Sequence, residues 1–159
     1  LTIDCFLLGG ERTLIQDPGF GLRQIVDIAA RALSPAINDP TTAVQAVDRL
    51  TSLVAVLARR PDPTGFYTDG DGVVRVSAPE PGFARLAELA YTEISLFGAD
   101  SPQVTRRLLA AYDVLEGLTD GARREAVDAI RRRTLAAMDA AMPAAFRDIA
   151  AHPDRLGFG

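Results

Sequence analysis

The chain has 159 residues and a formal net charge of −4, so it is long enough for one domain with a hydrophobic core. An acidic balance argues against a general nucleic-acid binder, and no nucleic-acid partner is expected. The single cysteine, Cys5, and the single histidine, His152, exclude an internal disulfide and a histidine-rich zinc site, and no cofactor is predicted.

No stretch reaches the roughly 18 consecutive apolar residues of a membrane span. The longest uncharged apolar run covers only residues 50–58. We therefore expect this chain to be soluble and to form a single domain over residues 1–159.

The amino-terminal residues favour β-structure. Residues 2–8 and 11–15 are rich in β-formers on either side of Gly9-Gly10, which predicts a hairpin or the last strands of a larger sheet. Asp17-Pro18-Gly19 is then predicted to turn the chain into a first long helix.

Residues 21–34 carry apolar side chains at helical spacing over most of the helix circumference. The remaining polar stripe consists of Arg23, Asp27 and Arg31 at four-residue intervals, so Asp27 can pair with either arginine. Because the rest of this helix is apolar, we expect it to be central and the stripe to be partly enclosed. Enclosed charges are costly unless paired, so the stripe should be internally compensated or should meet a ligand.

A second helix is predicted directly after the first. Pro35 should end the first helix, while Asp39 suits the N-cap of the second and Pro40 its first residue. The second helix should run to Arg59-Arg60, so that residues 21–60 form a helical hairpin.

The remaining elements are a β-hairpin and further helices. Strands are expected at residues 66–67 and 73–76, around the turn residues 69–72. Helices are predicted at residues 83–97, between Ser101-Pro102 and Gly117, between Thr119 or Asp120 and Pro143, and briefly before His152.

The fifth predicted helix has a thin apolar seam formed by Ala122, Ala126, Ile130 and Ala137, which could pack against a second copy of the chain and make a homo-oligomer. The predicted fold is mainly α: a bundle of five to six helices with one or two short β-hairpins.

Residues 12–50 read RTLIQDPGFGLRQIVDIAARALSPAINDPTTAVQAVDRL. This string resembles the signature segment of a bacterial family of predicted membrane proteins, the "domain of unknown function twenty-two fifty-four" family. The residues that carry the resemblance are Arg12-Thr13, Gln16-Asp17, Phe20 to Gln24, Asp27 to Ala29 and Arg31 to Ala43, with Ala36 where glycine is more usual.

The resemblance implies a setting and no activity. Family members carry transmembrane helices ahead of a soluble portion, so the parent chain should be embedded in the bacterial cell membrane. This chain would be a fragment of it, the soluble C-terminal part, on a side of the membrane that the sequence does not specify.

The polar residues of this segment are the candidate ligand-binding residues. They are expected to form one cluster where the first helix, its turn and the preceding strand meet: Arg12, Asp17, Arg23, Gln24, Asp27, Arg31, Ser34, Asn38, Asp39 and Thr42.

Two interpretations of this cluster stay open. The arginines could form an anion pocket, because guanidinium groups bind carboxylates or phosphates in a bidentate manner. The preferred interpretation is that they form an internal salt-bridge network with Asp17 and Asp27, while Asp39 caps a helix and Asn38 satisfies the loop backbone. In the second case, truncating one partner of an enclosed pair should cost about 3 kcal/mol.

The preferred interpretation is not enzymatic: a regulatory or interaction domain, with a small polar ligand at the Arg31-to-Pro40 motif as a candidate. The alternative is a metal-dependent enzyme acting on a polar or phosphorylated substrate through Asp17, Asp27 and Asp39. That alternative requires the three carboxylates to converge within ~5 Å of one another. Ser34 lacks both a neighbouring histidine and the glycine-flanked elbow of a hydrolase nucleophile.

Overall fold

Three helices begin with the same local signal. Asp17, Asp39 and Ser101 are N-caps whose side chains accept hydrogen bonds from backbone N–H groups three residues later, at 3.1, 3.1 and 3.5 Å. Each cap is followed by a proline, which has no N–H to leave unsatisfied in the first turn. The caps of the second and fourth predicted helices are confirmed. Asp17-Pro18-Gly19 is part of the first helix and its cap, not a preceding turn.

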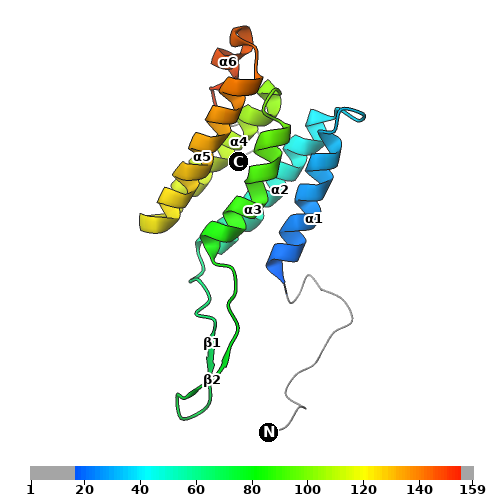
Figure 1. The fold of residues 1–159 in the computed structure, drawn as a ribbon. Helices are drawn as coiled ribbons and strands as arrows, with labels where there is room; N and C mark the ends of the chain where they lie inside the picture. Colours follow the sequence, from blue (N-terminus) through cyan, green and yellow to red (C-terminus); the bar gives the residue numbers. More distant parts are fainter. Residues whose placement is uncertain (1–16, 155–159) are drawn as a thin grey trace.

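The computed structural model describes residues 17–154. The strands expected in residues 2–15, and the candidate site residue Arg12, lie outside this range. Within it the elements are α1 (Pro18–Ala32), α2 (Pro40–Ala58), β1 (Phe66–Thr68), β2 (Val74–Ser77), α3 (Phe83–Phe97), α4 (Pro102–Glu116), α5 (Gly121–Ala141) and α6 (Ala144–Ala150). The prediction of a mainly α fold with a short β-hairpin is confirmed (Figure 1).

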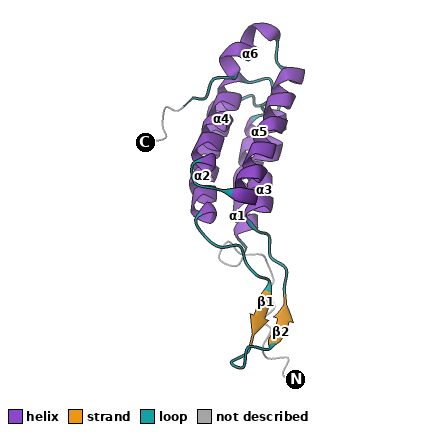
Figure 2. Ribbon diagram, turned by 90° about the vertical axis from the view of Figure 1, so that its left-hand side faces the viewer, coloured by secondary structure: helices purple, strands orange, loops and turns teal. Residues whose placement is uncertain are grey.

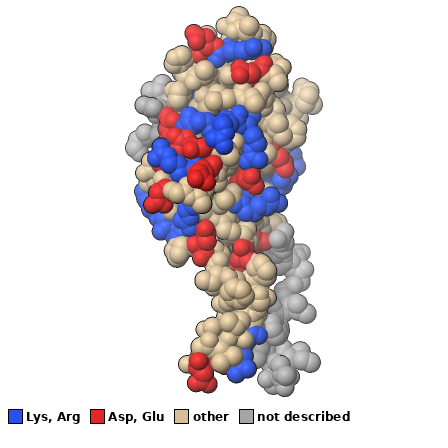
Figure 3. Space-filling model, turned by 60° about the vertical axis from the view of Figure 1, so that its left-hand side comes forward, with Lys and Arg blue, Asp and Glu red and all other residues tan. Residues whose placement is uncertain are grey.

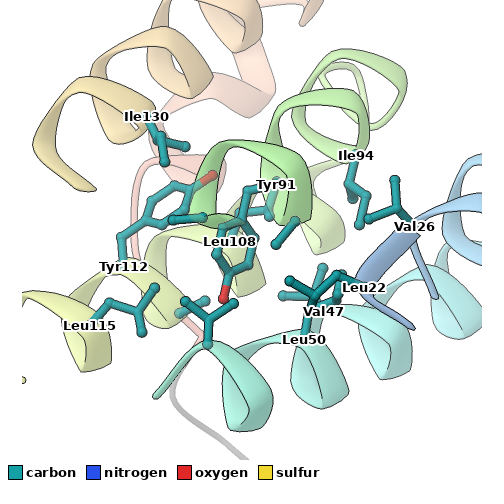
Figure 4. Packing of buried hydrophobic residues seen from close by; sticks show 14 of the residues in the cluster. Leu22, Val26, Val47, Leu50, Tyr91, Ile94, Leu108, Tyr112, Leu115 and Ile130 are labelled. Atoms are coloured by element: carbon teal, nitrogen blue, oxygen red, sulfur yellow. The ribbon is translucent and has the colours of Figure 1, made fainter. Parts of the chain in front are cut away.

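The helices pack in two layers. α3 lies between α1 and α5, while α2 packs against α4 behind them, and α6 covers the end of α4 and α5 (Figure 1). The two layers meet in a core built from all five long helices, in which Tyr91 and Tyr112 pack edge to face with ring centres 5.4 Å apart (Figure 4). Their hydroxyls bond to Thr51 (3.2 Å) and Thr134 (2.9 Å), so both buried phenols are satisfied.

α1 lies at the edge of this bundle, which corrects the expectation of a central first helix (Figure 1). Leu22, Val26 and Ala29 are buried on the side facing the core. Ile28, on the outer side, keeps 55% of its surface exposed, and Asp27 is 53% exposed at its side chain. An apolar residue count over the helix therefore overestimated how much of it is covered.

The buried face of α5 includes Ile130 of the predicted seam but none of its three alanines. The buried residues are Val127, Ile130, Thr134 and Met138, whereas Ala122 is exposed and Ala126 and Ala137 are half-buried. Thr134 can be buried in the core because its hydroxyl hydrogen-bonds to the hydroxyl of Tyr112 there. The alanines offered too little apolar surface to decide which side of α5 faces inward.

The β-hairpin projects from the end of the bundle where α2 ends and α3 begins (Figure 2). β1 and β2 pair antiparallel, with Tyr67 opposite Val76. Asp69 closes the turn, because its carboxylate accepts N–H bonds from Asp71 and Val73 and pairs with Arg75 at 2.6 Å. The hairpin predicted around residues 69–72 is therefore confirmed.

Candidate functional site

The turn between α1 and α2 carries the middle of the family-like segment. The carbonyl of Ser34 accepts bonds from the N–H groups of Ile37 (3.0 Å) and Asn38 (2.9 Å), and the N–H of Asp39 donates back to Ala32 (2.8 Å). Asn38 has a φ of +49°, a left-handed conformation that asparagine tolerates better than most residues. The N–H groups of Ile37, Asn38 and Asp39 are thus bonded within the turn itself.

Asp39 is engaged as a helix cap. Its carboxylate accepts from the Thr42 backbone N–H at 3.1 Å and from the Thr42 hydroxyl at 2.5 Å. These bonds favour the ionised form and lower the pKa of the Asp39 carboxyl, the hydroxyl bond contributing most. Ser34 is also used locally, since its hydroxyl donates to the carbonyl of Arg31 at 2.7 Å.

Arg23 connects α1 to α3. Its guanidinium binds both carboxylate oxygens of Glu93, one contact measuring 2.9 Å, and its Nε lies 2.9 Å from Asp27. The bond to Glu93 is the main reason that the pKa of Arg23 is raised. The predicted pairing of Asp27 with an arginine is confirmed for Arg23. Glu93 was missed, because a partner 70 residues away on another helix has no local sequence signal.

The rest of the α1 stripe faces away from the bundle. Gln24, Asp27 and Arg31 are exposed, and Arg31 makes no ion pair with any residue between 17 and 154. The expected partial enclosure therefore holds for Arg23 but not for Asp27 and Arg31, because the outer side of α1 has no covering element in the described range.

The three aspartates of the metal hypothesis do not converge. Asp17 caps the start of α1 and Asp39 follows its end, so the 15-residue helix separates them by about 22 Å. Within residues 17–154, no group of three or more His, Cys, Asp or Glu side chains is placed to hold a metal ion. One ion shared by Asp17, Asp27 and Asp39 is excluded by this geometry.

Two hollows lie near the start of α1. A groove of about 600 Å³ runs between α1 and α3, with Leu86 and Leu89 among its apolar lining residues and Arg23, Arg85, Glu88 and Arg133 among its charged ones. A second hollow of about 540 Å³ lies at the base of the β-hairpin; its lining includes five prolines and Arg60. The predicted site residues Asp17 and Arg23 line the groove, whereas the turn residues lie at the far end of α1.

The charges in the groove are largely paired with one another. Besides the Arg23–Glu93 pair, Arg133 lies 2.9 Å and Arg85 3.6 Å from Glu88. The bond from Arg133 is the main cause of the lowered pKa of Glu88. None of these three residues was singled out from the sequence, because each reads as an ordinary solvent-facing charge on its own helix.

A further polar contact joins α2 to α4. The Asp48 carboxylate lies 3.3 Å from Nε of the nearly buried Arg107. Burial raises the pKa of the Asp48 carboxyl, although Arg107 and Arg49 act in the opposite direction. Arg107 also donates to the carbonyl of Asp154, so this contact lies beneath the segment that follows α6.

Comparisons with known proteins agree with the sequence resemblance. The family described as "Predicted membrane protein (DUF2254)" matches residues 2–113. Uncharacterized proteins of Mycobacterium bovis and of a Mycobacterium tuberculosis strain are 44% identical over 121 residues, which is 76% of this chain and 23% of each relative. The chain thus spans about a quarter of the length of these relatives. No solved structure gives a significant match.

None of the helices in residues 17–154 is both long and apolar enough to cross a membrane. The family match covers well over half of the chain and includes the α1–α2 hairpin, whose turn and caps are described above. The chain belongs to the DUF2254 family of predicted membrane proteins, whose function is unknown.

Proposed function

We propose that this chain is a regulatory or interaction domain of a bacterial membrane protein, positioned beside the bilayer and not within it. Exposed arginines on α2, α3 and α5 support that position, because charged side chains are costly in hydrocarbon. The partner of the domain would be another segment of the parent protein, since the mycobacterial relatives are about four times as long as the matched region.

The observation that carries the proposal is the uncovered outer side of the α1–α2 hairpin. Ile28 on α1 is 55% exposed and Ile37 in the following turn 53% exposed, and Arg31, also on α1, has no carboxylate partner in the described range. Apolar side chains beside an available guanidinium are typical of protein contact surfaces, in which arginine is enriched. The polar side chains that could serve catalysis are instead used as caps and in pairs, at separate places along α1.

Site-specific photo-crosslinking in the parent protein tests this proposal. Benzoylphenylalanine placed at position 28 or 37 should form an adduct with peptides of the parent that lie outside this domain. The same probe at position 132, an exposed residue of α5, should not. Absence of adducts from positions 28 and 37, or equal adducts from all three, would refute an interaction at this surface.

A small polar ligand is a second candidate, and the groove between α1 and α3 favours it. Its volume of about 600 Å³ falls in the usual range for ligand sites. Its arginines, which now pair with glutamates, could bind the anionic group of a ligand in their place. A phosphorylated metabolite or carboxylate that binds there should raise the melting temperature. The shift should disappear in Arg85→Gln; a shift that disappears only in Asp39→Ala would place the ligand at the Arg31-to-Pro40 motif.

A further inference from the structure

The outer face of α2 combines arginines with exposed apolar side chains. Arg49, Leu53 and Val56 follow one another at intervals of four and three residues, which places them along one side of α2, and Arg60 follows two residues after the helix end at Ala58. Leu53 is 45% and Val56 48% exposed, and both arginines are exposed at the surface. Arg59 lies next to this stripe and is also exposed.

The arginines of this face have carboxylates nearby but no close ion pair in residues 17–154: Arg49 acts electrostatically on Asp48, and Arg60 lines the hollow that Asp17, Asp62 and Glu80 also line. Arg49, Arg59 and Arg60 make no ion pair within the described residues, whereas the arginines that face other helices do: Arg23, Arg107, Arg123, Arg131 and Arg133. The single acidic residue of α2, Asp48, points toward α4 and Arg107. On the face drawn in Figure 3, by contrast, arginines lie among aspartates and glutamates.

We propose that this outer face of α2, defined by Arg49, Leu53, Val56, Arg59 and Arg60, rests on the surface of an anionic lipid bilayer. Guanidinium groups bind lipid phosphates in a bidentate manner, and the two apolar side chains can enter the boundary between headgroups and acyl chains. The net charge of −4 gives the whole chain no general attraction to anionic lipid, so attraction must come from a local surface such as this one.

This inference goes beyond the proposed function, because it concerns a different surface and a lipid partner. Charge complementarity decides between lipid and a second copy of the chain. A two-fold contact through the α2 face would bring its arginines close to their own copies, which is unfavourable without intervening carboxylates. Membership in a family of predicted membrane proteins supports lipid as the partner of this face.

Vesicle co-sedimentation of the full 159-residue chain tests the proposal. Vesicles of phosphatidylcholine with about 30% phosphatidylserine should pellet the chain, and vesicles of phosphatidylcholine alone should not. Binding should weaken as salt is raised, because the Debye length shortens. Each Arg→Gln change at positions 49, 59 and 60 should lower the partition coefficient about fivefold, and the triple variant about 100-fold.

The matched control removes the same charge elsewhere. Arg85, Arg124 and Arg132 are exposed on α3 and α5, so their triple glutamine variant has the same net charge as the α2 triple variant. It should retain most of the binding. A charge-neutral variant, L53S/V56S, should lower the partition several-fold if the apolar side chains enter the interface. Circular dichroism and melting curves should match wild type for all three variants, since every changed residue is exposed.

Several results would overturn the proposal. One is failure of the wild-type chain to pellet with anionic vesicles at low salt, and another is an equal loss of binding in both triple variants. Self-association in the absence of vesicles that is lost only in the α2 variant, together with no vesicle binding, would assign this face to a second copy. Specific capture of an acidic protein without vesicle binding would likewise exclude the lipid surface.

Discussion

Arg131 on α5 and two arginines of the α1–α2 hairpin, Arg31 and Arg49, differ in their surroundings. Arg131 on α5 is only 22% exposed at its side chain, lies 2.6 Å from both Asp113 and Glu116 of α4, and stands 5.8 Å from the centre of the Tyr112 ring. Arg31 and Arg49 on the hairpin are exposed and have no carboxylate within ion-pair distance in residues 17–154. An arginine therefore joins two helices at Arg131, as Arg23 does between α1 and α3, but remains exposed at Arg31 and Arg49.

This difference shows that spacing along a helix does not determine what a charged residue does. The Arg23–Asp27–Arg31 stripe has ideal four-residue spacing, yet only Arg23 is tied to another helix, through Glu93. Arg131 has no such stripe, yet it makes the more buried contacts. An arginine is paired across helices only where a neighbouring helix carries carboxylates at the same level along the bundle axis.

The largest expected effect is at Arg131. The variant Arg131→Ala leaves Asp113 and Glu116 without this shared partner in a half-buried position and should lower the free energy of unfolding by about 3 kcal/mol. Arg132→Ala, at the exposed neighbouring position, is the control and should change it by less than about 0.5 kcal/mol. Urea denaturation measures both. Equal losses in the two variants would contradict the distinction between joining and available arginines.

A smaller effect is expected at Asp48 and depends on pH. Because the pKa of Asp48 is raised in the folded state, its ionisation destabilises the fold; this penalty is absent in acid, grows as the pH rises from the ordinary aspartate pKa towards the raised one, and is complete above it. The free energy of unfolding of Asp48→Asn should therefore improve relative to wild type as the pH rises from about 3 to about 7.

Glu88 provides the control of opposite sign. Its pKa is lowered, chiefly by Arg133, so its stabilising contribution is present above the ordinary glutamate pKa and is lost as the pH falls. The free energy of unfolding of Glu88→Gln should therefore fall relative to that of wild type over the same rise in pH. Urea denaturation of the three proteins at each pH provides the comparison. Parallel trends in the two variants would show that the burial of Asp48 does not govern its pKa.

The smallest effects are expected on the outer side of α1. Asp27→Asn and Arg31→Gln should each change the free energy of unfolding by less than about 0.5 kcal/mol, because exposed charges contribute little. This revises the loss of about 3 kcal/mol expected for an enclosed stripe. A loss of that size in either variant, measured by urea denaturation, would mean that a covering element encloses this side of α1.

Much of the local structure could be predicted from the sequence. Asp39-Pro40 and Ser101-Pro102 mark helix starts because a short polar side chain and the fixed φ of proline act within one turn. The hairpin around Asp69 was predictable for the same reason. Asp17-Pro18 carries the same signal, but the following glycine favours a turn in the sequence where the structure continues α1.

The candidate site was predicted only in part. Asp39, Asn38 and Ser34 have the local roles that their residue types favour at a helix start and in a turn. Glu93 and Arg133, which complete the groove beside α1, could not be found, because each becomes a partner only when helices distant in sequence lie side by side.

The sequence by itself determined where helices start and stop and that the chain is mainly α, because capping, proline geometry and apolar periodicity act over a few residues. Only the tertiary structure decided that α1 lies at the edge, that Thr134 and not an alanine seam faces inward on α5, and which arginines are paired. Those outcomes depend on which helices are neighbours in the bundle and on how far each is shifted along the bundle axis. They are set by the sum of many weak contacts across the core, which no single segment contains.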